Sequence, residues 1–122
     1  MSDKWQAIND FWNSFGLIAY DEQSVPDDAQ MPYIAYSASI SNFEEPVPIS
    51  ASVYYRSTSW VDISHKVDEI SAAIGTYYLQ KINDGYMFID RASPFAQRMS
   101  DPNDDMVRRV YINLMVEFFT KT

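Results

Sequence analysis

The hydrophobic and polar residues of the chain repeat with two different periods, and these periods divide it into helices and strands. Near the N-terminus, apolar residues recur every three or four positions over Lys4–Phe15, which predicts an amphipathic helix. Asp3 is the expected N-cap, and Gly16 is the expected left-handed residue after the last turn. The apolar stripe, which we expect to pack against a sheet, consists of Trp5, Ile8, Phe11, Trp12 and Phe15.

A second helix is predicted after a serine-rich segment. Ser59 and Asp62 occupy the two positions of a capping box, although Asp closes such a box less well than Glu. Gly75 is expected to end this helix, and His65, the single histidine, lies off its apolar stripe and is expected on the surface. The side chains expected to be buried are Trp60, Ile63, Val67, Ile70 and Ile74.

Alternation with a period of two predicts strands in most of the remaining chain. Pro32–Ser41 and Val47–Tyr55 alternate apolar with small polar residues, and the short connection Asn42–Pro46 makes them an antiparallel hairpin. Tyr77–Ile82 and Tyr86–Asp90 flank a tight turn that contains glycine, which indicates a second hairpin.

The last predicted strand is Met106–Phe119, whose even-numbered residues from position 110 onward are all apolar. Before it, Ser93–Asp105 is rich in turn residues and is predicted to be a long irregular loop. Leu17–Gln30 is predicted to be a connector with a short extended piece over Leu17–Tyr20. The expected order is therefore α-β-β-α-β-β-β. This order predicts one α+β domain over residues 1–122, with two helices packed on one face of a mostly antiparallel sheet.

Composition and charge narrow the classes of protein. A chain of 122 residues, 47% of them hydrophobic, is sufficient for one packed core. A net charge of −8 argues against direct binding to nucleic acid or to anionic membranes, since both require a cationic surface. The absence of cysteine excludes disulfides and thiolate chemistry. There is no signal peptide and no apolar run of about 20 residues, so we expect a soluble protein made in a cytoplasm.

No group of residues has the spacing of a catalytic or metal-binding site. Asp101, Asn103 and Asp105 imitate the start of a calcium-binding EF-hand loop. However, Met106 stands where that loop needs glycine, and Ile112 stands where it needs a bidentate glutamate. With a single histidine and three glycines, a Ser-His-Asp triad, a phosphate-binding glycine loop and a zinc site all lack support. We therefore expect no enzymatic activity, no cofactor and no bound metal.

Two predicted connections carry side chains that suit contacts with other proteins. The first hairpin tip places Phe43 beside Glu44 and Glu45, where it is either a stray aromatic in a solvated turn or an anchor with flanking charges that reject wrong partners. The long loop supplies the rest of the candidate interface, Pro94, Phe95, Arg98, Met99 and Asp101. We expect these residues to contact other protein subunits, and to matter for assembly and little for folding.

Two runs of sequence resemble small structural proteins from the assembly modules of tailed phages. They are Tyr54–Trp60, which leads into the second helix, and Ser93–Pro102, which precedes the last strand. With the start of a strand at Met31–Ile34 and the order of elements, the similarity covers nearly the whole chain, and it is greatest to the tail terminator (tail completion) proteins of long-tailed bacteriophages. This resemblance implies a structural virion protein that forms a ring, typically of six subunits. The ring would cap the tail tube, end its polymerisation and help join the tail to the head.

The resemblance also implies the partners, which are other copies of the chain, the tail tube protein and the head–tail connector protein. The protein would lie at the head-proximal end of the tail in the virion, after assembly in the cytoplasm of a bacterial host. Three alternatives stay open. A neck or head-completion connector uses similar small domains, an acidic phage inhibitor would imitate DNA to block a host protein, and a small-ligand-binding domain would need a polar pocket that the sequence does not indicate. The inhibitor would carry acidic residues along exposed helix faces, whereas here they cluster in predicted turns.

Overall fold

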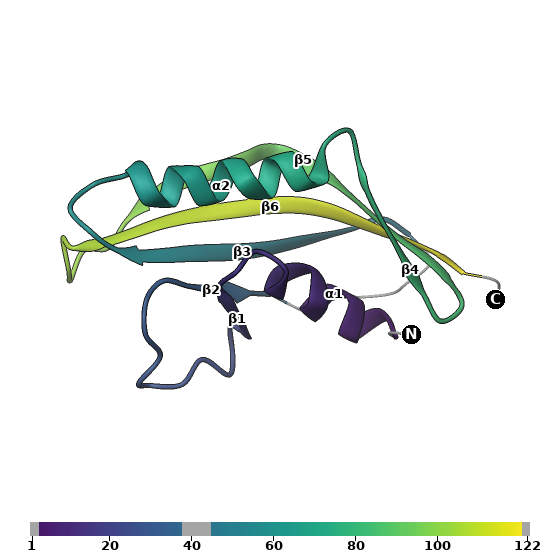
Figure 1. The fold of residues 1–122 in the computed structure, drawn as a ribbon, viewed down its shortest axis with the longest axis horizontal. Helices are drawn as coiled ribbons and strands as arrows, with labels where there is room; N and C mark the ends of the chain where they lie inside the picture. The colour runs from purple at the N-terminus through teal and green to yellow at the C-terminus, as the bar shows by residue number, and fades with distance from the viewer. Residues whose placement is uncertain (1–2, 38–44, 121–122) are drawn as a thin grey trace.

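The computed structural model describes residues 3–37 and 45–120. Two helices and a six-stranded sheet are present (Figure 1), and their sheet order is β1-β2-β3-β6-β5-β4. Every pairing in the described residues is antiparallel except that of β1 with β2. The predicted α+β class is thus confirmed. In chain order the elements are α1 (Lys4–Asn13), β1 (Ile18–Asp21), β2 (Tyr33–Tyr36), β3 (Val47–Arg56), α2 (Val61–Ile74), β4 (Tyr78–Ile82), β5 (Gly85–Ser100) and β6 (Val107–Thr120).

Helix α1 begins as predicted, because the Asp3 carboxylate accepts a hydrogen bond from the backbone N–H of Gln6 at 2.7 Å. Gly16 follows its last turn with φ of 82°, a conformation that favours glycine. One residue of the predicted buried stripe is wrong, because the Trp5 side chain is 48% exposed. The side chains that the helix buries are Ala7, Ile8, Phe11 and Trp12.

Strand β1 corrects the predicted order, because part of the expected connector pairs with β2. Its outer edge is closed by the side chain of Asn13 from α1. The Asn13 Oδ1 accepts from the Ala19 N–H at 3.0 Å, and the Asn13 Nδ2 donates to the Ala19 carbonyl at 3.4 Å. The amide therefore takes the place of a neighbouring strand. A four-residue strand of this kind is too short to show a period, so the observed order α-β-β-β-α-β-β-β was not predicted.

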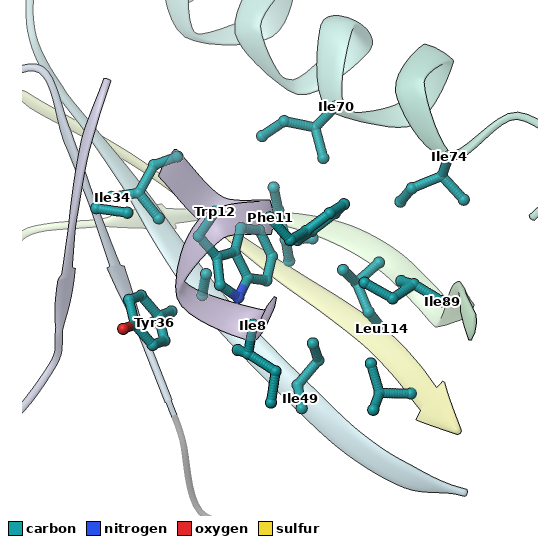
Figure 2. Packing of buried hydrophobic residues seen from close by; sticks show 14 of the residues in the cluster. Ile8, Phe11, Trp12, Ile34, Tyr36, Ile49, Ile70, Ile74, Ile89 and Leu114 are labelled. Atoms are coloured by element: carbon teal, nitrogen blue, oxygen red, sulfur yellow. The ribbon is translucent and has the colours of Figure 1, made fainter. Parts of the chain in front are cut away.

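One cluster of buried side chains joins both helices to the sheet. Alternate residues of β3 and β6 lie opposite each other, as in the pairs Val47↔Val116 and Ala51↔Ile112, and enter this cluster. Figure 2 shows Trp12 and Phe11 of α1 among these strand residues and near α2. The alternation predicted for the two strands is confirmed. The residues that α2 buries here are Ile63, Ile70 and Ile74.

The start of α2 differs from the prediction. Trp60 is its N-cap residue and makes no capping hydrogen bond through its side chain, whereas the Ser59 hydroxyl accepts from the Val61 N–H at 3.1 Å. Trp60 also lies outside the fully buried stripe and only packs against its border. The reason lies in two arginines, Arg98 and Arg108, whose guanidinium groups lie against the indole ring and hold it at the surface.

The long loop predicted over Ser93–Asp105 is wrong for most of its length. Strand β5 continues to Ser100 and pairs with β6 on both sides of an irregularity between Arg91 and Ala96. Such a bulge shifts the side-chain alternation, so the sequence lacks the period that marks a regular strand. The irregular connection between β5 and β6 is therefore confined to residues 101–106.

Candidate protein-binding site

The two predicted contact segments lie at opposite ends of the sheet and do not come together. Glu45 precedes β3 at the end where Val47 pairs with Val116, whereas Ser100 pairs with Arg108 at the other end of β6. These two positions on β6 are roughly 26 Å apart at the usual rise of a strand. The other two predicted residues of the hairpin tip, Phe43 and Glu44, lie outside the described residues.

Arg98 is the predicted contact residue whose geometry best suits a partner. Its side chain is exposed, and its guanidinium carbon lies 4.7 Å from the centre of the Trp60 ring. This cation–π contact fixes the position of the guanidinium group without using its hydrogen-bond donors. In the part of the chain that the structure describes, no carboxylate forms an ion pair with Arg98. Its donors are therefore available to a carboxylate on another molecule, which an arginine binds in a bidentate manner.

Arg108 is a second arginine that contacts the Trp60 ring. Its guanidinium carbon lies 5.3 Å from the centre of the Trp60 ring. Two of its nitrogens are used inside the chain, because they donate to the carbonyl of Asp105 at 2.7 Å and to the carbonyl of Thr58 at 2.8 Å. Trp60 is thus a rigid base for Arg98. Sequence reasoning missed this role because it placed Trp60 in the core.

Met99 lies beside Arg98 but points to the opposite face of the sheet. It is 38% exposed and pairs with Arg109 of β6. The Arg109 Nε donates to the buried Ser52 hydroxyl at 2.9 Å, and its guanidinium carbon lies 5.7 Å from the Tyr54 ring centre. Arg109 was not predicted as a candidate. The one signal for it in the sequence is the mixed character of the odd-numbered residues of the last strand.

Phe95 belongs to the folded structure and is not a mobile anchor. It is partly buried against the core, and the guanidinium carbon of Arg91 lies 5.7 Å from its ring centre. Pro94 is exposed, and its carbonyl accepts from the Asn113 side-chain amide at 3.1 Å. The predicted interface thus loses Phe95, because the bulge in β5 turns this side chain toward the core.

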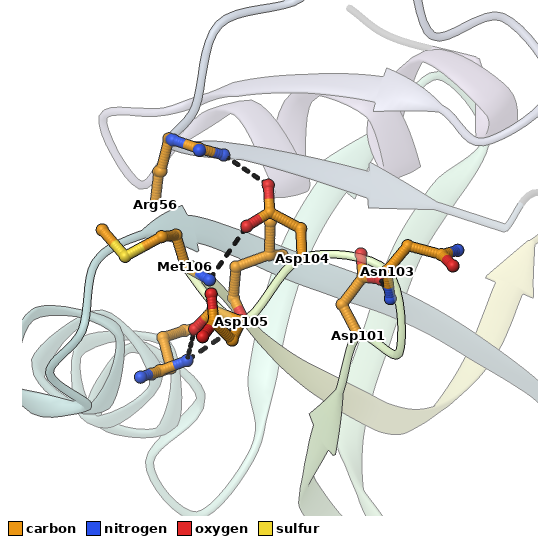
Figure 3. A network of polar contacts seen from close by, with 8 residues as sticks. Arg56, Asp101, Asn103, Asp104, Asp105 and Met106 are labelled. Atoms are coloured by element: carbon orange, nitrogen blue, oxygen red, sulfur yellow. Dashed lines mark hydrogen bonds and ion pairs between the residues drawn. The ribbon is translucent and has the colours of Figure 1, made fainter.

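Asp101 forms part of the turn that joins β5 to β6 (Figure 3). Its carboxylate accepts from the Asn103 N–H at 2.8 Å, which is the local bond of an Asx turn. Asp104 accepts from the Met106 N–H at 2.9 Å and pairs with Arg56 at 2.7 Å. The described residues contain no group of three or more possible metal ligands. This turn is thus fixed by its own side chains.

The ion pair between Asp104 and Arg56 predicts a weak pH dependence of stability. The hydrogen bond from Arg56 holds the pKa of the Asp104 carboxyl below its ordinary value of 3.8. A carboxyl with a lowered pKa stabilises the folded state above its unfolded pKa, and this contribution disappears as the pH falls through the folded pKa. Arg56→Gln should therefore lower the melting temperature slightly at neutral pH and less at strongly acidic pH. A difference in melting temperature that stays constant down to acidic pH would contradict this assignment.

Comparison of the chain with protein-family models, with curated proteins and with solved structures found no match. Within residues 3–37 and 45–120, neither helix has the length and apolar character needed to cross a bilayer. The function is therefore inferred from the sequence resemblance and from the surface of the chain itself.

Proposed function

We propose that the chain is a ring-forming structural protein of a phage virion, a tail terminator that caps the tail tube and helps join the tail to the head. Its partners in this proposal are other copies of the chain, the tail tube protein and the head–tail connector. In this proposal both helices pack on one face of the sheet, as the sequence predicts. The two ends of the sheet are then available for contacts with neighbouring subunits.

The exposed guanidinium of Arg98 is the observation that carries the proposal. Its guanidinium carbon lies 4.7 Å from the centre of the Trp60 ring, and it has no carboxylate partner in the described residues. In a chain with a net charge of −8, acidic groups are plentiful on every neighbouring copy. An oriented arginine is the kind of anchor that protein interfaces use, and the exposed Met99 adds apolar surface at the same end of the sheet, on its other face.

A closed ring needs two different contact patches on each subunit, related by rotation. Arg98 and Met99 lie at one end of the sheet, and the connection that contains Glu45 lies at the other. This separation supports a head-to-tail contact in which Arg98 of one copy donates hydrogen bonds to a carboxylate at the opposite end of the next copy.

The proposal predicts that Arg98 and Met99 matter for assembly and little for folding. The double variant Arg98→Ala with Met99→Ala should lower the free energy of unfolding by only about 1 kcal/mol, since it removes one cation–π contact and exposed surface. Light scattering after size-exclusion chromatography should show that the variant no longer forms rings. In the phage that encodes the chain, electron microscopy should show tails of uncontrolled length that do not join heads.

His65→Ala is the control, because it removes an exposed side chain from α2 that belongs to neither proposed contact. This control should leave ring formation and tail length unchanged. Tails of normal length on infectious particles of the double variant would overturn the site assignment. If deletion of the gene for this chain from the phage left tails of normal length, the proposed function itself would be overturned.

A further inference from the structure

The two outer edges of the sheet differ in whether their backbone N–H and C=O groups are covered. The edge formed by β1 is closed by the Asn13 amide, which bonds both backbone groups of Ala19. At the other edge, β5 beyond its pairing with β4 is interrupted by the bulge and by Pro94, which obstruct the addition of a further strand. Strand β4 has neither protection. In the described residues, no hydrogen bond reaches its backbone from outside its pairing with β5.

The backbone groups that β4 leaves open can be identified from its register. Ile82 and Gly85 pair across a two-residue turn, so they exchange their own hydrogen bonds. Because these pairs alternate along antiparallel strands, Gln80 and Tyr78 also face β5. Leu79 and Lys81 therefore point their N–H and C=O groups outward, away from the sheet.

Large apolar side chains gather on the sheet face next to this open edge. The cross-strand pairs Leu79↔Phe88, Lys81↔Tyr86 and Tyr86↔Phe119 place them on one face. Four of them are about half exposed, namely Tyr77 at 53%, Leu79 at 50%, Tyr86 at 45% and Phe119 at 51%. Their exposed parts sum to roughly 400 Å², which is the size of the largest apolar patch on a typical monomer. We call Tyr77, Leu79, Tyr86, Phe88 and Phe119 the aromatic patch.

We propose that β4 is a self-association edge, at which a second copy of the chain adds its own β4 antiparallel about a two-fold axis at Leu79. Leu79 then lies opposite Leu79 of the second copy, and the two aromatic patches become continuous across the axis. The outward backbone groups of Leu79 and Lys81 gain hydrogen bonds. Two sheets join into one.

The charge of Lys81 favours a second copy of the chain as the partner, and it favours this register over the others. With the axis at Leu79, each Lys81 lies opposite Tyr77 of the other copy, and its ammonium group meets an aromatic ring. An axis at Lys81 would place two ammonium groups opposite each other, which destabilises a strand pair. An axis at Gln80 would place Tyr77 opposite Asn83 of the turn. An axis at Tyr78 would place Lys81 opposite Gly75 at the end of α2, so each of these two axes leaves outward backbone groups unpaired. The edge is therefore complementary to itself in one register.

The expected association is reversible. Two aromatic patches with the joined strand edges bury less than the roughly 1,600 Å² of a standard stable interface. The dimer should therefore dissociate on dilution. It goes beyond the proposed ring, because the two-fold axis turns the copies in opposite directions whereas the subunits of a cyclic ring all point the same way. The two-fold dimer depends on Leu79, whereas the ring contact depends on Arg98. An experiment can therefore contradict one proposal without contradicting the other.

Cysteine cross-linking tests the register directly, because the 122 residues of the chain include no cysteine. Hydrogen-bonded antiparallel pairs hold their Cα atoms about 5.5 Å apart, which lies within the range of disulfides. Leu79→Cys should therefore form a covalent dimer under mild oxidation. Lys81→Cys should not, because its counterpart is Tyr77, and Ile18→Cys, a control on the closed edge at 61% exposure, should not either. Equal cross-linking of all three variants, or faster cross-linking through Lys81→Cys, would overturn the proposal.

Sedimentation at several protein concentrations tests the association without a covalent bond. The parent chain should show a concentration-dependent dimer, and Leu79→Lys should weaken it at least about tenfold by placing like charges at the axis. Ile18→Lys, which adds the same charge to the closed edge, should leave the dimer unchanged. Amide hydrogen exchange at Leu79 and Lys81 should slow as the parent chain is concentrated. A parent chain without this dimer, or one whose dimer survives Leu79→Lys, would overturn the inference.

Discussion

Replacing Trp12 by alanine is expected to lower the free energy of unfolding by about 3–5 kcal/mol, the usual loss when a large buried aromatic is removed. Trp12 is fully buried, and its ring lies edge-on to that of Phe11 with 5.0 Å between the centres. Its indole nitrogen is buried and has no hydrogen-bond partner in the described residues, so the loss comes from packing. Because domains are stable by about 5–15 kcal/mol, this change could remove most of the margin.

Denaturant unfolding followed by circular dichroism measures this effect. Trp12→Phe keeps most of the buried volume and should cost less than the alanine variant. Trp5→Ala is the control in the same helix, because Trp5 is 48% exposed and its removal leaves no cavity in the core. A midpoint for Trp12→Ala close to that of the parent chain would show that α1 does not pack as described.

Arg91→Ala is expected to lower the free energy of unfolding by about 2–4 kcal/mol, since charge-assisted hydrogen bonds to carbonyls at a helix end are lost. The Arg91 guanidinium donates to the carbonyl of Ser71 at 2.6 Å and to the carbonyl of Gly75 at 2.6 Å. Both carbonyls lie at the C-terminal end of α2, where Gly75 is the C-cap residue and its N–H donates to the Ser71 carbonyl at 3.1 Å, so Arg91 adds a second bond at Ser71 and a first one at Gly75. The same side chain also packs on Phe95, so both the bulge of β5 and the end of α2 depend on it.

Two further variants separate the parts of this contact. Arg91→Lys keeps the positive charge but cannot reach both carbonyls with one flat group, so its loss should be intermediate. Ser71→Ala removes only the hydroxyl that the guanidinium also contacts, and should cost least. Thermal or denaturant unfolding gives the three values. Equal stability of Arg91→Lys and the parent chain would show that charge alone, and not the paired hydrogen bonds, holds the helix end.

The parts of the fold that were predicted are those whose own sequence carries a period. The alternation of Val47–Tyr55 and Met106–Phe119 identified β3 and β6, and the cap at Asp3 identified the start of α1. Strand β5 beyond Arg91 was missed because a bulge interrupts its period. Strand β1 was predicted only as a short extended piece of a connector, because four residues are too few to show a period and its pairing with β2 could not be predicted.

The candidate site was predicted less well, because its geometry depends on residues far apart in the chain. The composition of the segment from 93 to 105 did indicate Arg98 and Met99, which are exposed. It could not show that Phe95 turns inward or that Trp60 supports Arg98 across 38 positions of sequence. Such contacts arise from strand register and twist, which local composition does not encode.

The position of β6 has a consequence for how the chain acquires its structure. This strand comes last in the sequence, yet it lies between β3 and β5 and pairs with both. A chain still being synthesised can form its helices and the β4–β5 hairpin, but the centre of the sheet stays open until the final strand has been made. The closing contacts span long sequence separations, which slows folding and leaves partly folded chains with exposed strand edges. We expect the sheet to close only once β6 has been synthesised, as a late and cooperative step that inserts this strand between β3 and β5.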